Sequence, residues 1–181
     1  GDCGILKSFR DWAYDRGETI RATTSFLMAD STTPDGDYIK PQTNPTNTDC
    51  WNGKAYTPLN QLTPGRTKYG TNNNVRIFRY ADVLLMNAEA KIKNGKSGDA
   101  PFNEVRRRAQ MPELTNVTFE QVIDERRMEL VCEWGERYND LVRTGLAKTD
   151  LKGRSEEKGL LPLPFNQYTQ IPDLLKEPKD E

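Results

Sequence analysis

A run of apolar residues at helical spacing in the middle of the chain restricts the fold more than any other feature of the sequence. The residues that recur at alternating steps of three and four positions are Phe78, Ala81, Leu85, Ala88 and Ile92. On an α-helix these steps bring all of them onto one face. Asn94-Gly95 ends the predicted helix, because glycine adopts the left-handed cap at little cost.

A second and a third helix follow in the sequence. The second runs from about Pro101 to Ala109, with Phe102 and Val105 toward the core, and Pro112 prevents its continuation. The third begins at a capping box, Thr118 followed by Gln121, and ends at Thr144-Gly145. Its predicted apolar face contains Phe119, Val122, Ile123, Leu130, Val131, Trp134, Tyr138, Leu141 and Val142.

Three residues of the third helix carry separate predictions. We expect Trp134 in the core and Cys132 as a buried free thiol in the same stripe, whereas Gly135 marks a bend or break.

The small residues Ala81 and Ala88 of the first helix allow helices to approach closely. Antiparallel helix pairing, as in helical-hairpin repeats, is the simplest way to bury the stripes.

The sequence divides into three regions by composition. Residues 1–74 are rich in Thr, Asn, Pro, Gly and Asp, and we interpret them as a loop-rich candidate ligand surface with short strands. Within them, Thr19–Met28 is a candidate strand and Thr33–Gly36 a turn. Residues 75–145 form the three-helix scaffold, and residues 146–181 form an irregular C-terminal segment that packs on it.

Charge and residue usage exclude several classes of function. With 26 basic and 27 acidic residues, the chain has no bulk field that favours nucleic acid or an acidic membrane surface. It contains no histidine, which is the commonest general base and metal ligand. No apolar run approaches the roughly 20 residues that span a bilayer. Cys3, Cys50 and Cys132 lack metal-site spacing, and their disulfide state stays open.

Five segments in a fixed order closely resemble the SusD/RagB family. They are RYADVLLMNAEA at 79–90, FNEVRRRA at 102–109, IDERRMEL at 123–130, WGERYNDLVRTG at 134–145 and LPLP at 161–164. The ordered resemblance covers residues 76–164 and is therefore far more specific than one short motif. It corresponds to the C-terminal part of such proteins, and a fragment and a short natural form are both open.

The resemblance implies a fold and a role. The implied fold is mainly α, with tetratricopeptide-like helical hairpins and long irregular loops. The implied role is a non-catalytic subunit that binds an oligo- or polysaccharide, needs no cofactor, and delivers the glycan to a SusC-like TonB-dependent transporter. The implied location is the cell outer membrane, surface-exposed, through a lipid anchor that is absent from this chain. The alternative is a helical-hairpin module that binds protein and no sugar.

Aromatic residues in the loop-rich region are the candidate ligand contacts. Trp51 lies in a polar loop and is flanked by Tyr38 and Tyr56. Flat rings stack on the apolar faces of sugars while neighbouring amides and carboxylates bind hydroxyl groups. The alternative is that these rings hold the loops onto the helices. Trp12 we interpret as a packing residue.

Carboxylates give two further candidate sites. Glu125, Glu129, Glu133 and Glu136 alternate with arginines, and we interpret them as scaffold ion pairs, including a surface pair of Glu133 with Arg137. A two-carboxylate glycosidase site is disfavoured, because carboxylates on one helix do not face each other across a sugar. The acidic loop of Asp30, Asp35 and Asp37 offers oxygen ligands for calcium but lacks a complete calcium loop. We expect a solvated turn there and no metal site.

Overall fold

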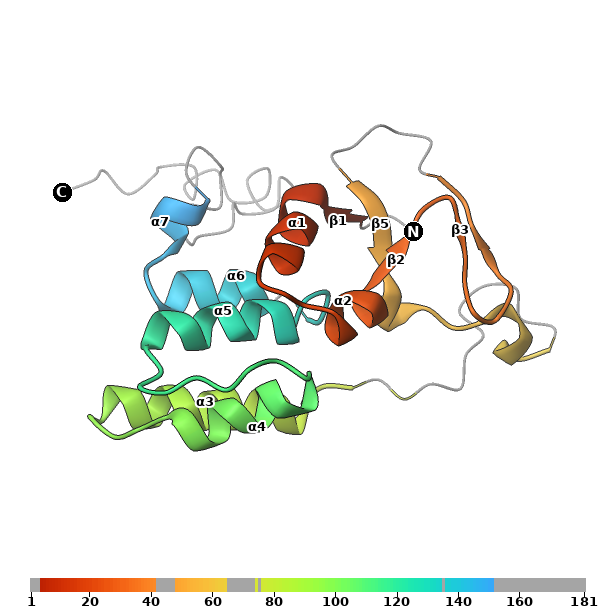
Figure 1. The fold of residues 1–181 in the computed structure, drawn as a ribbon. Helices are drawn as coiled ribbons and strands as arrows, with labels where there is room; N and C mark the ends of the chain where they lie inside the picture. The colour runs from red at the N-terminus through yellow and green to blue at the C-terminus, as the bar shows by residue number, and fades with distance from the viewer. Residues whose placement is uncertain (1–3, 42–47, 65–73, 75, 135, 152–181) are drawn as a thin grey trace, which may run out of the picture. The chain divides into compact units, whose positions relative to one another are not determined.

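The computed structural model describes residues 4–41, 48–64, 74, 76–134 and 136–151 (Figure 1). The chain forms two compact units, Gly1–Arg137 and Tyr138–Glu181. The division at residues 74/75 and 145/146, which we drew from composition, stays a prediction.

The helical part of the first unit consists of α3 (Tyr80–Lys93), α4 (Asp99–Arg108) and α5 (Phe119–Glu129). α3 lies against both α4 and α5, as Figure 1 shows. The core between them contains Ala81, Leu84, Leu85, Ala88, Phe102, Val105, Val117 and Val122. Helices are confirmed at all three predicted places, and Ala81, Leu85, Ala88, Phe102, Val105 and Val122 of their predicted apolar faces lie in this core. α3 with α4 forms a helical hairpin.

The ends of these helices follow the local sequence signals. Gly95 has a φ of 68°, and the Lys96 amide donates to the Lys91 carbonyl at 2.9 Å, which closes α3 as expected. A Cβ at Gly98 would come within 2.9 Å of α3, so the tight link to α4 requires glycine there. Thr118 and Gln121 form the predicted capping box of α5.

Two predictions about helix extent are wrong. Phe78 is 74% exposed because α3 begins only at Tyr80. The third helix does not run through to Thr144. It ends at Glu129, and the chain turns through residues 130–134 before α6 (Glu136–Arg143) begins. The break precedes Gly135, since Cys132 and Trp134 already adopt left-handed backbone conformations with φ of 62° and 39°.

The prediction that Cys132 and Trp134 are buried is wrong for the same reason. The turn removes both residues from the helical stripe, and both are exposed. By contrast, Val122, Ile123 and Leu130 are buried as predicted.

A small sheet with two short helices forms the rest of the first unit. The strands β1 (Gly4–Leu6), β5 (Thr48–Asn52) and β2 (Phe26–Met28) are antiparallel in the order β1-β5-β2. The helices are α1 (Lys7–Asp15) and α2 (Ile20–Ser25), which we had not predicted. The prediction of a strand over Thr19–Met28 is therefore wrong, except for the last three residues, which form β2. The core here contains Ile5, Ala13, Ala22, Phe26, Cys50 and Met128.

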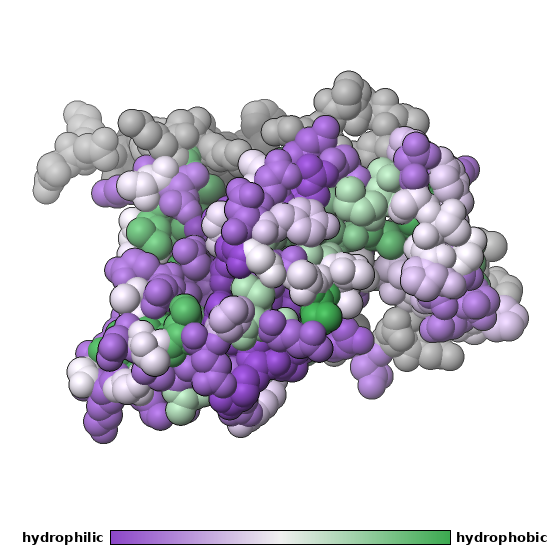
Figure 2. Space-filling model, in the orientation of Figure 1, coloured by the Kyte–Doolittle hydropathy of each residue, from purple (hydrophilic) through white to green (hydrophobic). Residues whose placement is uncertain are grey.

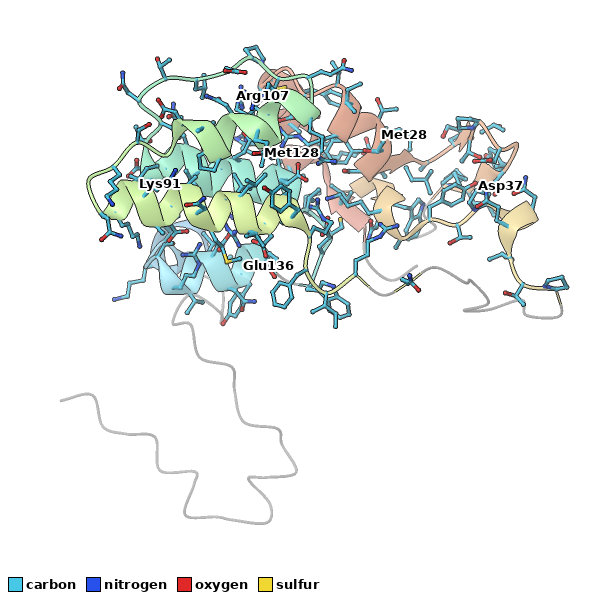
Figure 3. All side chains as sticks on the ribbon, turned by 90° about the horizontal axis from the view of Figure 1, so that it is seen from below. Met28, Asp37, Lys91, Arg107, Met128 and Glu136 are labelled. Carbon is cyan, nitrogen blue, oxygen red and sulfur yellow. The ribbon has the colours of Figure 1, made fainter. Side chains whose placement is uncertain are left out.

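Met128 of this second core belongs to α5, so α5 contributes to both apolar clusters of the first unit. Figure 3 labels Met128 among the helices, and Figure 2 shows that hydrophilic side chains (purple) dominate the visible surface over α3, α4 and α5. Trp12 packs at the edge of the second core, as predicted. The guanidinium of Arg127 lies 4.3 Å from its ring centroid.

A hairpin of β3 (Ser31–Thr32) and β4 (Tyr38–Ile39) extends from the sheet region. The predicted turn at Thr33–Gly36 is confirmed, with Gly36 at a φ of 90°. Two 3-10 turns follow β5, at Gly53–Ala55 and Leu59–Gln61. Figures 1 and 3 both place the hairpin away from α3 and α4.

The described part of the second unit contains the rest of α6 and the short helix α7 (Ala147–Asp150). Leu141 is buried as predicted, whereas Val142 is exposed. The predicted packing of the C-terminal segment concerns mainly residues 152–181, which lie outside the described residues. Cys3 lies outside them as well. No helix in the described ranges is both long and apolar enough to cross a membrane.

Candidate functional site

Trp51 lies in the middle of β5, opposite Gly4 on β1 and Leu27 on β2. Its neighbour Cys50 points into the core, and side chains alternate along a strand, so the indole lies on the opposite face of the sheet. The ring is half-buried, and Nε1 donates to the Lys40 carbonyl at 3.4 Å. Trp51 therefore offers one partly covered ring.

Tyr38 and Tyr56 both bind the hairpin through their hydroxyl groups. Tyr38 donates to Asp30 at 2.6 Å, and Tyr56 donates to Asp37 at 2.6 Å. The hydrogen bond to Asp30 raises the pKa of Tyr38, and desolvation together with the bond to Asp37 raises the pKa of Tyr56. Both phenol hydroxyl groups therefore bind carboxylates of the β3–β4 hairpin.

The acidic loop is held together by these same contacts. Besides the Tyr56 hydroxyl, the Asp37 carboxylate accepts the Leu59 amide at 2.8 Å. Figure 3 labels Asp37 on the hairpin. Within the described ranges, no three His, Cys, Asp or Glu side chains gather where they could hold a metal ion. Asp37 therefore acts as a hydrogen-bond acceptor that fixes the turn.

A pocket of about 630 Å³ lies in another part of the first unit, and this volume is typical of ligand sites. Segments far apart in the sequence line it: α2, the turn after β5, the chain before α3, the end of α4 and the turn after α5. The predicted residues Trp51, Tyr38 and Tyr56 do not line it. Its lining includes the side chains of Ser25, Lys54, Arg76, Arg79, Arg108 and Trp134.

Trp134 supplies the aromatic wall of this pocket. Its side chain is 63% exposed, and Nε1 donates to the Arg76 carbonyl at 2.5 Å. A left-handed backbone at a bulky residue is strained, and such strain often accompanies a binding function. One sequence signal of this arrangement is the helix-interrupting Gly135 directly after Trp134. The prediction that the indole lies in the core is wrong.

Two carboxylates at the pocket wall each bind more than one basic side chain. Glu129 accepts from Arg79 at 2.7 Å and from Arg108 at 2.5 Å. Glu133 accepts from Arg79 at 2.7 Å and from Lys54 at 2.6 Å. The predicted helical pair of Glu133 with Arg137 is wrong, because the turn after α5 removes the helical spacing between them. Both glutamates face a pocket as well as the scaffold.

The protonation states at this wall follow from burial and charge. Burial lowers the pKa of Lys54, although its contact with Glu133 acts in the opposite direction. Burial alone would raise the pKa of Glu133, but hydrogen bonds from Arg79 and Lys54 outweigh it and lower the pKa. Glu133 is therefore ionised at neutral pH, with its charge balanced by two cations.

A buried ion-pair network lies behind the pocket wall. Glu125 is fully buried and accepts from Arg21 at 2.6 Å, Arg106 at 2.9 Å and Arg16 at 2.8 Å. Arg21 also contacts Glu129, which connects this network to the pocket. The scaffold role that we predicted for Glu125 and Glu129 is confirmed, since removing either would leave buried arginines without their partner.

The fold and the pocket define a helical-hairpin scaffold protein with a ligand-sized pocket. A sequence profile of the SusD family matches residues 5–175, and the chain belongs to that family. The mainly α fold that we predicted from the resemblance is thereby confirmed. 

Two curated relatives support this assignment. A SusD-like protein of Formosa agariphila is 32% identical over 119 residues, which cover 56% of this chain and 24% of that protein. The starch-binding protein SusD of Bacteroides thetaiotaomicron is 33% identical over 100 residues, covering 52% of this chain and 18% of that protein. The aligned segments are thus a small part of either relative.

Two solved structures have a similar fold. A surface glycan-binding protein A from Bacteroides thetaiotaomicron matches with a TM-score of 0.73 and 27% identity, over 96% of this chain and 40% of the other. A surface glycan-binding protein A from Bacteroides uniformis matches with a TM-score of 0.53 and 32% identity, over 80% of this chain and 30% of the other.

Proposed function

We propose that this chain binds an oligo- or polysaccharide as part of a non-catalytic SusD-type nutrient-binding protein. Three relatives, one a starch-binding protein and two surface glycan-binding proteins, support a sugar ligand. The observation that carries the proposal for this chain is the pocket itself, in which the exposed indole of Trp134 stands beside a group of hydrogen-bond donors.

The chemistry of this pocket suits a sugar. An aromatic ring gives the apolar face of a pyranose a flat contact, and the donors around it bind oxygen atoms at the ring's edge. Because the Trp134 N–H already binds the Arg76 carbonyl, the indole offers its face alone. Polar recognition then falls to Lys54, Arg108 and their neighbours.

The same residues argue against hydrolysis. A glycosidase needs one carboxyl group whose pKa is raised so that it can donate a proton. At the pocket wall the pKa of Glu133 is lowered, and both wall carboxylates bind cations. We therefore propose binding without turnover, and no cofactor takes part.

The partner and the location follow from family membership alone. We propose that the bound glycan is passed to a SusC-like TonB-dependent transporter. The protein would then stand at the outer membrane surface, held by a lipid anchor.

Trp51, Tyr38 and Tyr56 stay predicted ligand contacts in a second position. Trp51 is the strongest of them, since its ring is partly exposed on the outer face of the sheet and Gly4 beside it adds no side chain. Tyr56 is the weakest, since its hydroxyl group already binds Asp37 and Thr33.

Affinity gel electrophoresis over a panel of neutral and acidic glycans tests the proposal, with Trp134→Ala and Trp51→Ala as each other's controls. We expect retardation of the unaltered chain by at least one glycan. Trp134→Ala should abolish most of it, because the indole face is the flat apolar contact that the pocket offers to a sugar ring. Thermal unfolding confirms that both variants are folded. Retardation that depends on Trp51 alone would move the site to the sheet, and no retardation by any glycan would refute sugar binding by this chain.

One observation favours the second candidate function, a module that binds protein. Large apolar side chains are exposed at the start and along one side of α3: Ile77, Phe78, Tyr80, Val83 and Met86. Exposed apolar groups of this kind mark interaction surfaces. A pull-down with a SusC-like transporter, comparing the unaltered chain with Phe78→Ser, separates the two. If protein binding alone is the function, Phe78→Ser reduces capture and no glycan is bound.

A further inference from the structure

The pocket beside Trp134 carries more positive than negative charge. Its basic side chains are Arg21, Lys54, Arg76, Arg79 and Arg108, and its acidic ones are Glu129 and Glu133. Arg21 is further balanced by Glu18 and Glu125, but those carboxylates are themselves shared with Arg16 and Arg106. A net positive charge therefore remains at the pocket, although the chain as a whole has a net charge of −1.

The excess positive charge lies on arginine side chains whose N–H donors are not all used in hydrogen bonds. Arg79 uses Nε, Nη1 and Nη2 on the two glutamates and is a wall residue. Arg108 is different, since its side chain is 61% exposed and its one described hydrogen bond, to Glu129, leaves most of the five guanidinium donors free. The Arg76 side chain forms no hydrogen bond or ion pair within the described part of the chain.

A buried hydroxyl group points to a ligand at the same place. Ser25, the last residue of α2, lines the pocket, and its Oγ is fully buried without a hydrogen-bond partner among the described residues. Leaving such a group unsatisfied costs about 1–3 kcal/mol, so buried hydroxyl groups are rarely left in this state. A polar ligand in the pocket would satisfy it.

We infer that the pocket selects glycans that carry an anionic group, a carboxylate or a sulfate ester. The sugar ring lies against the Trp134 face, the anion is bound by Arg76 and Arg108, and Ser25 binds a further oxygen. Guanidinium groups bind carboxylate and sulfate oxygens through parallel N–H donors, which a neutral hydroxyl group does not match. This assignment rests on the proposed glycan binding and adds the chemical class of the ligand.

Isothermal titration with matched probes tests the anionic group. The first pair is a galacturonic acid oligomer and its methyl ester, which differ only in the charge of the carboxyl group. The second pair is dextran sulfate and dextran. We expect the acid to bind about tenfold more tightly than the ester, since a hydrogen bond to a charged group contributes more than a neutral one. If only dextran sulfate binds, the anionic group that the pocket selects is a sulfate ester and not a carboxylate.

Two single variants of this chain, Arg108→Gln and Arg76→Gln, test whether the anionic group binds at these arginines. Arg107→Gln is the matched control, because Arg107 lies next to Arg108 on α4, has a similarly exposed side chain at 58%, and does not line the pocket. Figure 3 labels Arg107 on that helix. Both test variants should lose about tenfold in affinity for the acid and keep their affinity for the ester, whereas Arg107→Gln binds both as before. Arg76→Gln is expected to fold, since no described contact of its side chain is lost.

Three results would overturn the inference. If the ester binds as tightly as the acid and Trp134→Ala abolishes both, the proposed sugar binding stands and the anionic preference is refuted. If Arg107→Gln weakens acid binding as much as Arg108→Gln, the attraction is unspecific and the pocket is not its place. If neither pair of probes binds and no glycan of the wider panel does, sugar binding and the anionic preference fail together.

Discussion

Replacing Glu125 by glutamine should destabilise the first unit severely. Glu125 is fully buried and its two oxygens accept hydrogen bonds from Arg21, Arg106 and Arg16 at 2.6–2.9 Å. Glutamine keeps the shape but removes the charge, and its NH₂ group meets a guanidinium in place of an acceptor. Breaking a buried ion pair by removing one partner costs about 3–5 kcal/mol. That is a large share of the about 5–15 kcal/mol by which a typical domain is stable.

The assay is urea unfolding followed by circular dichroism, with Glu113→Gln as the control. Glu113 also pairs with an arginine, Arg107, but both side chains are more than half exposed. The control should change the free energy of unfolding by no more than about 1 kcal/mol. If Glu125→Gln and Glu113→Gln differ by less than 1 kcal/mol, the network does not hold the scaffold together and our reasoning is refuted.

The pH dependence of the same unfolding experiment provides a second readout. Burial alone would raise the pKa of Glu125, but Arg21, Arg16 and Arg106 outweigh it and the pKa is lowered. A carboxyl group with a lowered pKa in the folded state stabilises the fold above its unfolded pKa of about 4.3, and this contribution is lost as the pH falls through the folded pKa. The unaltered chain should therefore lose more stability below about pH 4.3 than Glu125→Gln does.

Three further predictions follow from individual contacts. Ser25→Ala should leave the free energy of unfolding unchanged or raise it, since the substitution removes an unsatisfied buried hydroxyl group. The same variant should bind an acidic glycan more weakly. A clear loss of stability in urea unfolding would show that Oγ has a partner. A thiol reagent at pH 7.5 should modify the exposed Cys132 in the folded chain and reach Cys50 only after unfolding, because Cys50 is buried and its pKa is raised to about 11; equal labelling by peptide mass spectrometry would contradict this. Thr118→Ala should lower the free energy of unfolding by about 1 kcal/mol through loss of the α5 cap, with Thr23→Ala on α2 as the exposed comparison, and no change in urea unfolding would count against the cap.

The helical scaffold was predictable from the sequence because its signals are local. The repeat of Ala81, Leu85 and Ala88 fixes one buried face, and the Thr118 capping box fixes the start of α5. Such patterns need only neighbouring residues for their interpretation. In the short helix α1, Phe9, Trp12 and Ala13 follow helical spacing, but this signal spans little more than one turn and does not by itself predict a helix. α2 shows no such repeat, and the packing of Ala22 against the sheet determines it.

The end of α5 was not predictable in the same way. Continuing apolar spacing through Leu130, Trp134 and Leu141 suggested one long helix. The chain instead leaves the helical region at Cys132 and Trp134, two residue types that rarely adopt a positive φ. Gly135 marks a break in the sequence, but the positive φ at Cys132 and Trp134 has no local signal of its own. The bond from Trp134 to the Arg76 carbonyl is one contact that accompanies it.

The candidate site was missed for a related reason. Ser25, Lys54, Arg76, Arg108 and Trp134 come from five separate segments of the chain. Only the fold brings them together, and each of them alone looks like an ordinary surface or core residue. The sequence did direct attention to the aromatic residues before α3, and Trp51 remains a predicted contact, but the sequence contains no information about which ring borders a pocket.

A crystal structure of the chain with a bound galacturonic acid oligomer tests the central claim most directly. The account predicts a sugar ring against the face of Trp134, with its carboxylate within hydrogen-bond distance of Arg108 or Arg76. A sugar bound on the outer face of the sheet at Trp51, with the pocket beside Trp134 free of ligand, would contradict it.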